Sequence, residues 1–578
     1  MRRWFHRWTE PLTAKIGALP ARRVTWGLVA IFSAWVLLDV LVFKFSGGLS
    51  QASFDAMVRA RIYAAAPDPR IVVIDIDEAS LSRMAREFGR WPWPRDTLAT
   101  VLDHVEKQQP AAVVWDILFS DADRLNPGGD AAFNEAARRS PHSHFSVVRL
   151  PGANDASSQI TQAALPGLWL PDASPKPAAS TSDPVMATVA LIPPALPALA
   201  AGRLGFNNGY VDADGVLRRY RYAEALADGS TIQSIAWSAA NGVTTVTKNA
   251  TNSVAEYAHL AGVSGQFDWK DPLISWRKTA NAYPHVSFAD VFDAAEGGKL
   301  KTPIPRFTGK VVIIGSTAPS LHDIHPTPLS PTQAGVDSLA TALDNALNQR
   351  HLAELPRALQ AGLAIALCVA MALWVQFKSV ASLAPALFAL PIALLGLSYL
   401  SLNGLPVFVD LHLAAGLALI FLAVLRGWSS LRRNYWCSPP PPTPSDAPQS
   451  FAIWPWERRA AWLDAPLDRL IDAVERHAPR CRLVVGDASA TWPASLRWPE
   501  LARFVAVVGP QDALLAARSK LAPSLKRLAG RSLDPLLLDS PPDRENLAHN
   551  VFLAWAALQK PETNPVANAK TANNEPTL

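Results

Sequence analysis

Four stretches of the chain are apolar over lengths that match the thickness of a bilayer. The first covers residues 25–45, and three more follow one another closely at residues 357–377, 380–402 and 407–427. A helix of about 20 apolar residues crosses roughly 30 Å of hydrocarbon, so each stretch predicts a membrane-spanning helix. Short connections join the last three stretches, which indicates antiparallel neighbours. The pattern therefore predicts a protein that crosses the lipid bilayer four times.

The distribution of lysine and arginine predicts the orientation of these helices. Residues 1–24 form a basic segment, Lys378 separates the second and third spans, and Arg432 and Arg433 follow the fourth. The connection between the third and fourth spans has no basic residue. Because basic residues are enriched in cytoplasmic loops, we expect both termini in the cytoplasm and residues 46–356 outside it.

One carboxylate, Asp39, lies within the first predicted span. Ionisable residues in hydrocarbon are costly and often functional. Since Asp39 is not central in the span, we expect its side chain to reach water at the outer interface. A functional role within the membrane is the alternative.

Alternation of β-branched runs and amphipathic segments predicts an α/β domain between the first and second spans. Its opening consists of a buried strand at residues 71–77, a helix at 78–88 capped by Asp77, a helix at 96–108 capped by Asp96, and a strand at 111–119. This succession is a right-handed crossover between parallel strands. Further strands are expected at residues 145–150, 186–191, 205–211 and 310–314, and residues 152–184 form a polar insertion. The domain is therefore expected to contain a parallel or mixed sheet.

Carboxylates follow the predicted strands at the edge where α/β sheets bind ligands. Asp75, Asp77 and Asp116 lie at or near the carboxyl ends of strands that we expect to be adjacent, where they could hold a divalent cation. The alternative is structural, with Asp77 capping a helix and the other two bonded to the backbone or to Arg90 and Arg95. No complete set of metal ligands is visible, so we favour the structural alternative and predict no metal.

An aromatic loop at residues 90–95 (RWPWPR) is a second candidate for ligand contact. Trp91, Trp93 and Arg95 could form an aromatic and cationic rim around a ligand. The alternative is that the loop packs against the sheet, which is the commoner fate of such tryptophans.

Polar residues after the strand at 310–314 are a third candidate. Ser316 lies in a turn that resembles an anion-binding strand–helix turn, although the chain has no phosphate-loop motif there. Asp323 lies between His322 and His325, and these side chains could bind a metal. Three polar residues in one loop are more often only part of a loop.

Several of these segments, in this order, resemble the CHASE2 extracellular sensory domain. The opening is similar over residues 71–80, 90–95 and 113–119, and the later part over residues 205–219, 309–316, Asp323, 327–329 and 335–347. The three closely spaced spans also resemble CHASE2 receptors, so the resemblance covers roughly residues 48–430. It implies a multi-pass sensor of the bacterial inner membrane, whose periplasmic domain detects a ligand or protein that the resemblance does not identify.

The end of the chain predicts a proline-rich linker at residues 438–450, a small cytoplasmic α/β module at 451–560 and a disordered tail at 561–578. Within the module, the pattern predicts helices at residues 467–476, 512–528 and 544–559 and strands at 482–486, 504–509 and 535–538. CHASE2 receptors commonly end in a kinase or a nucleotide cyclase, and this chain departs from that pattern.

No nucleotide loop, kinase motif or cyclase motif occurs after residue 450. We therefore expect neither an enzyme nor a cofactor, and we expect the module to bind an unknown cytoplasmic effector protein. A weaker alternative is a divergent nucleotide site at Asp487 and Asp539, which follow predicted strands. His549, on the last predicted helix, is expected to be an ordinary helix-face histidine.

Composition narrows the class of protein. Hydrophobic residues make up 49% of the 578 and charged residues 18%, below the roughly 25% of soluble proteins. The 3 cysteines exclude a disulfide scaffold. No dense basic stripe occurs in spite of the net charge of +5, so no nucleic-acid partner is expected.

Two hypotheses of function follow. The first is a membrane sensor that passes an environmental signal to a cytoplasmic partner. The alternative is a structural accessory subunit of an envelope secretion or polysaccharide-assembly complex. In either role the chain could form a homo-oligomer.

Overall fold

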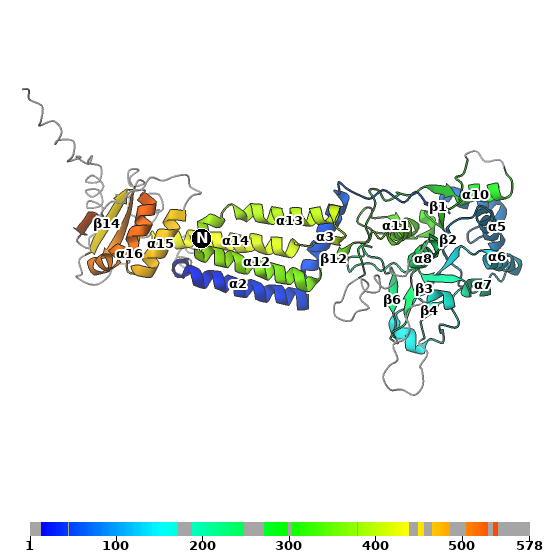
Figure 1. The fold of residues 1–578 in the computed structure, drawn as a ribbon, viewed down its shortest axis with the longest axis horizontal. Coiled ribbons are helices and arrows are strands. Elements are labelled where there is room, and N and C mark those ends of the chain that lie inside the picture. The colour runs from blue at the N-terminus through cyan, green and yellow to red at the C-terminus, as the bar shows by residue number, and fades with distance from the viewer. Residues whose placement is uncertain are drawn as a thin grey trace, which may run out of the picture. The chain divides into compact units, whose positions relative to one another are not determined.

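A computed structural model (Figure 1) describes residues 13–43, 45–170, 188–227, 229–247, 271–298, 303–377, 380–437, 449–455, 465–485, 504–529 and 536–540. The chain divides into two compact units. The large unit comprises Lys44–Leu359 and Gly396–His412, and the bundle unit comprises Met1–Phe43, Gln360–Leu395 and Leu413–Leu578.

The large unit is built on a sheet of seven strands. Its order is β4-β3-β2-β9-β1-β8, with β5 also paired to β3. The strands are β1 Ile71–Asp75, β2 Ala112–Leu118, β3 Ser143–Arg149, β4 Leu191–Ile192, β5 Arg203–Phe206, β8 His285–Ser287 and β9 Val311–Gly315. Every pair is parallel except β3 and β4. The predicted α/β class with a mixed sheet is confirmed, but β9 lies between β1 and β2, so the expectation that these two are adjacent is wrong.

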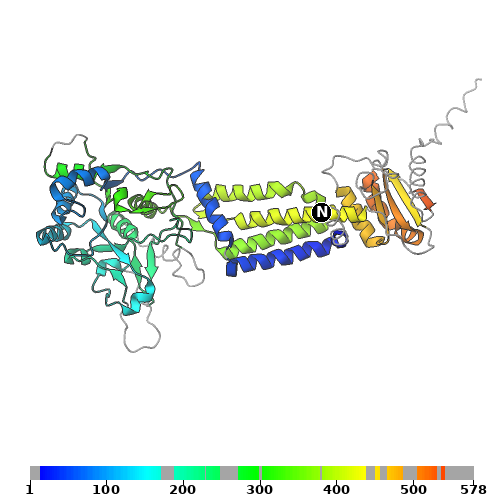
Figure 2. The ribbon, with the colours of Figure 1, turned by 180° about the vertical axis from the view of Figure 1, so that it is seen from behind.

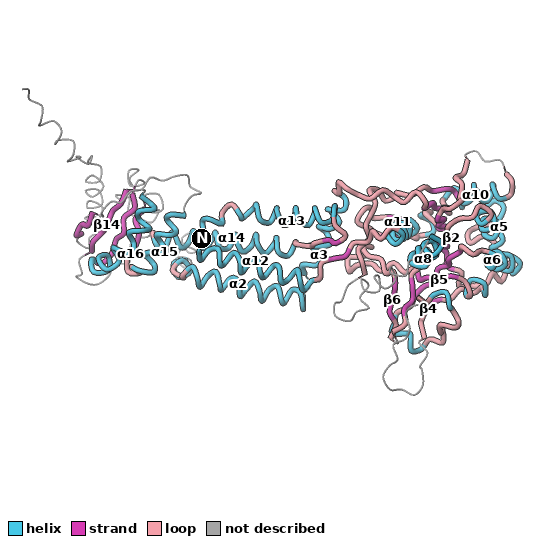
Figure 3. The backbone as a smooth tube through the Cα atoms, viewed as in Figure 1, coloured by secondary structure: helices cyan, strands magenta, loops and turns pink. Residues whose placement is uncertain are grey.

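Helices cover both faces of this sheet (Figure 3). Alternate residues of β1 point to opposite faces, so Val72 and Ile74 pack in one apolar core while Ile71 and Val73 pack in another. The first core includes residues of α4 Glu78–Phe88, α5 Arg95–Glu106, α6 Pro127–Arg139 and α10 Phe288–Ala295. The second includes residues of α3 Phe45–Arg59, α8 Ile235–Thr247 and α11 Gly335–Leu347.

Smaller elements complete the large unit. They are the hairpin of β6 Ala223–Ala225 and β7 Thr231–Gln233, the hairpin of β10 Ile324–His325 and β11 Gln333–Ala334, and the short helix α7 Pro197–Ala200. Turns of 3₁₀ helix occur at Gly152–Ser157, Pro166–Leu168 and Pro319–Leu321. The remainder of the predicted insertion, residues 171–184, lies outside the described residues.

Local predictions in the opening segment hold closely. Asp77 accepts a hydrogen bond from the Ser80 amide at 2.7 Å and so caps α4 as predicted, and Gly89 follows this helix with φ of 81°. Helix α5 begins at Arg95, because Pro94 occupies the cap position. Asp96 therefore lies in the first turn instead of capping the helix.

Among the described residues, four helices are long and apolar enough to cross a membrane: Ala21–Phe43, Arg357–Phe377, Ala386–Gly404 and His412–Trp436. The first consists of α2 Ala21–Leu38 and a π-helical turn at Asp39–Phe43, and the others are α12, α13 and α14. These helices lie side by side in both views (Figures 1 and 2), with a shared apolar core. Asp39 is only 2% exposed, so the expectation that it reaches water is wrong.

The fourth helix begins at His412, later than the predicted span at residues 407–427. Val407–Phe408 instead forms a short strand, β13, which pairs in parallel with β12 Ala353–Glu354. A two-residue ladder leaves no hydropathy signal of its own, which is why the sequence pattern merged it with the span.

The bundle unit also contains a sheet of order β15-β16-β14-β17, in which every pair is antiparallel; we call the residues from β14 to β17 the inner module, after its expected location. Its elements are β14 Gln449–Pro455, α15 Ala465–His477, β15 Arg482–Val485, β16 Phe504–Pro510, α16 Gln511–Ala529 and β17 Leu536–Ser540. Helix α15 confirms the predicted helix at residues 467–476, and its buried side chains include Leu467, Leu470, Ile471 and Val474. Strand β14 was not predicted and begins within the expected linker.

The direction of these strands bears on the nucleotide-site alternative. Strands β15 and β17 run in opposite directions, so their carboxyl ends lie at opposite ends of the sheet. Asp539 lies on β17, whereas Asp487, His549 and the predicted helix at 544–559 lie outside the described residues. The nucleotide-site alternative stays a prediction.

Candidate functional site

A buried carboxylate, Asp75, lies at the carboxyl end of β1 and is surrounded by groups of the protein itself. Its oxygens accept hydrogen bonds from the Thr317 amide at 2.8 Å and from the Thr317 hydroxyl at 2.6 Å. The Ser316 hydroxyl donates to the Ile76 carbonyl at 2.7 Å and accepts from the Ala318 amide at 3.0 Å. The turn after β9 thus binds an anion as its sequence suggests, but that anion is the carboxylate of Asp75.

His285 connects Asp75 to a second carboxylate, Asp337. The His285 Nδ1 lies 3.1 Å from an oxygen of Asp75, and Nε2 lies 3.0 Å from an oxygen of Asp337 on α11. Burial alone lowers the pKa of His285, but hydrogen bonds and charge from Asp337 and Asp75 outweigh it and raise the pKa to about 9. An imidazolium ion between two carboxylates therefore joins β1, β8 and α11 at neutral pH.

Asp77 has the structural role that the sequence favours. Besides capping α4, its carboxylate accepts a hydrogen bond from the Ser287 hydroxyl at 3.2 Å. The hydroxyls of Ser80 and Ser287 share a hydrogen bond of 2.8 Å, so the start of α4 is attached to β8.

Asp116 lies on β2, on the side of β9 opposite to β1, and it is close to Gly315. A Cβ atom on Gly315 would lie 2.9 Å from the Cβ of Asp116, so a side chain there would displace this carboxylate. One Asp116 oxygen accepts from the Asn207 amide group, and the other is buried without a partner among the described residues. Burial, followed by the charge of Asp323, raises the pKa of Asp116 to about 7.

Asp323 and His325 complete this second polar cluster. An oxygen of Asp323 lies 3.5 Å from the His325 Nε2, and this contact raises the pKa of His325. The structure therefore divides the predicted carboxylates into two groups: Asp75 and Asp77 lie on one side of β9, and Asp116 and Asp323 on the other. Among the described residues, no group of three or more His, Cys, Asp or Glu side chains is arranged to hold a metal ion.

The aromatic loop packs against the sheet, as its structural alternative predicts. Trp93 is buried in the core, with its ring centroid 4.9 Å from that of Trp91 and 5.2 Å from that of Phe288. The Arg95 guanidinium pairs with Asp130 and lies 5.6 Å above the Phe119 ring. These contacts hold the loop against the domain, and ligand contact by the partly exposed Trp91 and Arg95 stays a prediction.

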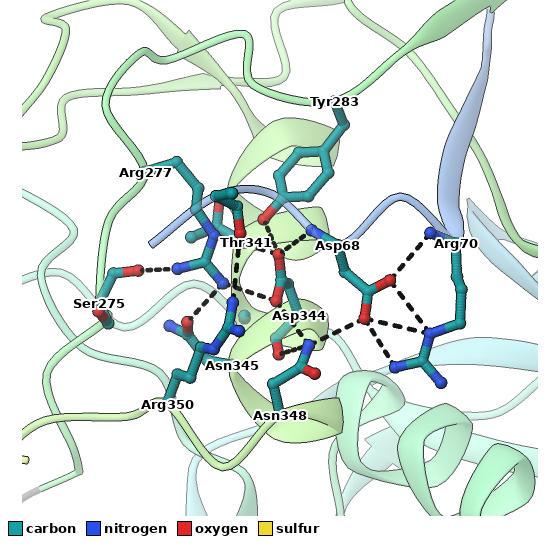
Figure 4. Close-up of polar contacts among 12 residues, drawn as sticks. Asp68, Arg70, Ser275, Arg277, Tyr283, Thr341, Asp344, Asn345, Asn348 and Arg350 are labelled. Atoms are coloured by element: carbon teal, nitrogen blue, oxygen red, sulfur yellow. Dashed lines mark hydrogen bonds and ion pairs between the residues drawn. The ribbon is translucent and has the colours of Figure 1, made fainter. Parts of the chain in front are cut away.

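The sequence did not reveal a buried ionic cluster around α11 (Figure 4). Arg277 pairs with Asp344 at 2.7 Å, and both side chains are fully buried. The other oxygen of Asp344 accepts from the Tyr283 hydroxyl and from the Asp68 amide, each at 2.9 Å. Asp68 pairs in turn with Arg70 at 2.6 Å. The cluster attaches α11 to the residues that lead into β1.

A second unpredicted cluster involves the helix that follows the first span. Arg218 is 2% exposed and donates to both oxygens of Asp55 on α3, at 2.7 and 2.8 Å. It also pairs with Asp212 at 3.0 Å and with Asp214 at 2.6 Å. Burial alone would lower the pKa of Arg218. The hydrogen bonds that Arg218 donates to these carboxylates outweigh this effect and raise its pKa. We call these four residues the Arg218 clamp.

Neighbouring contacts extend this region to the segments that lead into the other spans. The Phe54 ring of α3 lies 5.2 Å from that of Phe408 on β13. Arg219, next to the clamp, pairs with Glu354 on β12. Strand β12 precedes α12, and β13 precedes α14. The clamp region is therefore connected to three of the four segments that join the large unit to the candidate spans.

Comparison with known proteins identifies one family. The family model described as the CHASE2 domain matches residues 28–374. A search of the curated proteins and a search of the solved structures each found no match.

Proposed function

The chain belongs to the CHASE2 domain family, and from this premise we propose that it is a bacterial inner-membrane sensor. Its large unit senses a periplasmic stimulus, and its inner module binds an effector protein without catalysing a reaction. Both termini lie in the cytoplasm in this proposal. The family supports the sensory role, and the Arg218 clamp is the observation that supports a route from the large unit to the spans.

The input side of this route depends on α3. A stimulus changes the populations of two arrangements only if it binds one of them more tightly. Through Arg218, the clamp links Asp55 of α3 to Asp212 and Asp214. A shift of the segment that carries Asp212 and Asp214 therefore moves α3. Helix α3 begins two residues after Phe43, the last residue of the first span. A change in the clamp therefore reaches the first span through a short covalent connection.

The output side depends on the end of α14. Arg432 is buried and pairs with Asp472 at 2.6 Å and with Glu475, both on α15. Arg433 pairs with Asp468 at 2.8 Å. Arg482 of β15 lies 4.6 Å above the Tyr435 ring and 4.8 Å above the Trp436 ring. These contacts attach the inner module to α14, so a shift or rotation of that helix moves the module.

Hydrogen exchange of the full chain in lipid nanodiscs tests the proposal. We compare the Arg218→Met variant, which breaks the clamp, with Arg221→Met, which removes pairs to Asp271 and Glu224 within the same unit. Arg218→Met is expected to change the exchange rates of α15, while Arg221→Met leaves them unchanged. Changes confined to α3 and residues 205–220 in the Arg218→Met variant would contradict a route to the inner module.

A further inference from the structure

Helix α3 presents an apolar face that is exposed in the part of the chain that the structure describes. Phe45 is 81% exposed and Leu49 66% exposed, and both belong to a row with Gly48, Ala52 and Ala56. At 3.6 residues per turn, these five positions fall within an arc of about 100°. The opposite side of the helix buries Phe54 and Val58 against the core of the large unit. The helix thus has two apolar sides, one packed on the domain and one exposed along its first three turns.

The contacts of α3 place it at the level where the spans leave the hydrocarbon. One residue separates the start of α3 from the end of the first span. A Cβ atom on Gly47 would lie close to the Arg357 guanidinium at the start of α12. Ser50 donates to Asp410 just before α14. Arg61, after the end of the helix, donates to the Leu402 carbonyl of α13 at 2.6 Å.

The chain connection and two of these contacts come from residues 45–50 at the start of the helix, and the third comes from Arg61, two residues after its end. A helix of 15 residues is about 22 Å long. Because residues at both ends of α3 contact the ends of candidate spans, the axis of α3 runs across these span ends.

Exposed apolar side chains continue beyond α3 at the same level. Ile62 is 79% exposed and Tyr63 75%, and they directly follow the helix. Leu400 and Leu405, at the end of α13, are also exposed within this unit. An apolar surface of this kind marks a site of membrane or protein contact, and tyrosine is enriched at membrane interfaces.

We propose that α3 lies in the interface of the outer leaflet, with Phe45, Leu49, Ala52 and Ala56 directed into the acyl-chain boundary of the lipids. The occupant is lipid because α3 directly follows one candidate span and its end contacts another, where the Tyr399 hydroxyl of α13 donates to the Ala60 carbonyl at 2.8 Å. A helix whose exposed apolar face is buried at the headgroup–acyl boundary lies in the plane of the interface.

This position has a consequence that rests on the proposed function. The lipid-facing helix is also the helix that carries Asp55 of the Arg218 clamp. The packing or thickness of the outer leaflet then acts on the same element as the periplasmic domain, so the bilayer itself contributes to the input.

Spin-label accessibility tests the lipid contact. Single cysteines at Leu49→Cys and Ala56→Cys are labelled in the full chain in nanodiscs of phosphatidylethanolamine and phosphatidylglycerol. The control is Leu125→Cys, an apolar residue of the large unit that is 98% exposed in a loop far along the chain from the spans. The native Cys368, Cys437 and Cys481 are buried, and the unsubstituted chain serves as the labelling background.

At positions 49 and 56, collisions with oxygen are expected to exceed those with a water-soluble nickel complex severalfold, and the order is reversed at position 125. Nickel access at 49 equal to that at 125 means that the face is in water, which overturns the proposal. Exclusion of both reagents with spin–spin broadening means that a second copy covers the face, which also overturns it. The measurement needs no signalling readout, so its result is separate from that of the hydrogen-exchange experiment.

Discussion

At the scale of residues, long-range charge pairs determine how the large unit is held together. His285 joins carboxylates from β1 and α11, and Asp344 joins Arg277 to the segment before β1. A buried ion pair contributes little net stability relative to an apolar substitute, but the removal of one partner is costly because the other charge remains buried. Single substitutions at these positions should therefore have large effects.

His285→Gln should change how stability depends on pH. The pKa of His285 rises from 6.5 to about 9 in the folded chain, so its stabilising effect is complete below pH 6.5 and is lost as the pH rises toward 9. The wild type should therefore lose up to about 3 kcal/mol across this window from this residue, and the variant should not. Thermal unfolding of the full chain in nanodiscs between these pH values measures the difference. Equal slopes for the two proteins would show that His285 is not charged in the fold.

Asp344→Ala should destabilise the large unit by about 3–5 kcal/mol, because it leaves the buried Arg277 guanidinium without its carboxylate. A matched control is Asp103→Ala, which breaks an exposed pair with Arg139 and should cost about 0–1 kcal/mol. Denaturant unfolding followed by tryptophan fluorescence compares the two. Similar losses of stability in the two variants would mean that the buried cluster in Figure 4 contributes no more than an exposed ion pair.

At the scale of elements, capping and periodicity made several helices predictable. Asp77 before α4 and the apolar stripe of α15 each depend on residues within one or two turns. The short strands β8, β12 and β13 were missed, because two or three residues carry no usable period. Their existence depends on partner strands that are distant in the sequence.

The contact between α14 and α15 should respond to charge reversal. Arg432→Glu places a carboxylate against Asp472 and Glu475, and like charges at this distance repel. Hydrogen exchange of α15 should become severalfold faster in the full chain. The combined variant Arg432→Glu with Asp472→Arg and Glu475→Arg should restore part of the protection. No recovery in the combined variant would show that the contact depends on packing and not on charge.

At the scale of the whole molecule, the proposal depends on the compartment of each unit. Alkaline phosphatase inserted at Gly229, in the turn between β6 and β7, should be active because that turn is expected in the periplasm. Green fluorescent protein fused after Leu578 should fluoresce because the carboxyl terminus is expected in the cytoplasm. The opposite pair of results would contradict the orientation, while insertion of both fusions in the membrane serves as the control.

The candidate site could be predicted only in part. The sequence identified Asp75, Asp116 and Asp323 as polar residues near strand ends, and it left both a structural and a ligand-binding interpretation open. It did not identify His285 or Asp337, since a single histidine or aspartate carries no motif. The strand order explains why the sequence grouped Asp75 and Asp116 wrongly. Strand β9, which comes much later in the chain, lies between β1 and β2.

The sequence by itself determined the four candidate membrane spans, the α/β class, the family and the local helices. These properties depend on composition or on residues within a few positions of one another, so they can be predicted from the sequence alone. The tertiary structure alone decided the order of the sheet, the His285 link and the Arg218 clamp. Arg218 and Asp55 are 163 positions apart, and their pairing depends on how the whole chain closes its loops and buries its charges. No local pattern records that outcome.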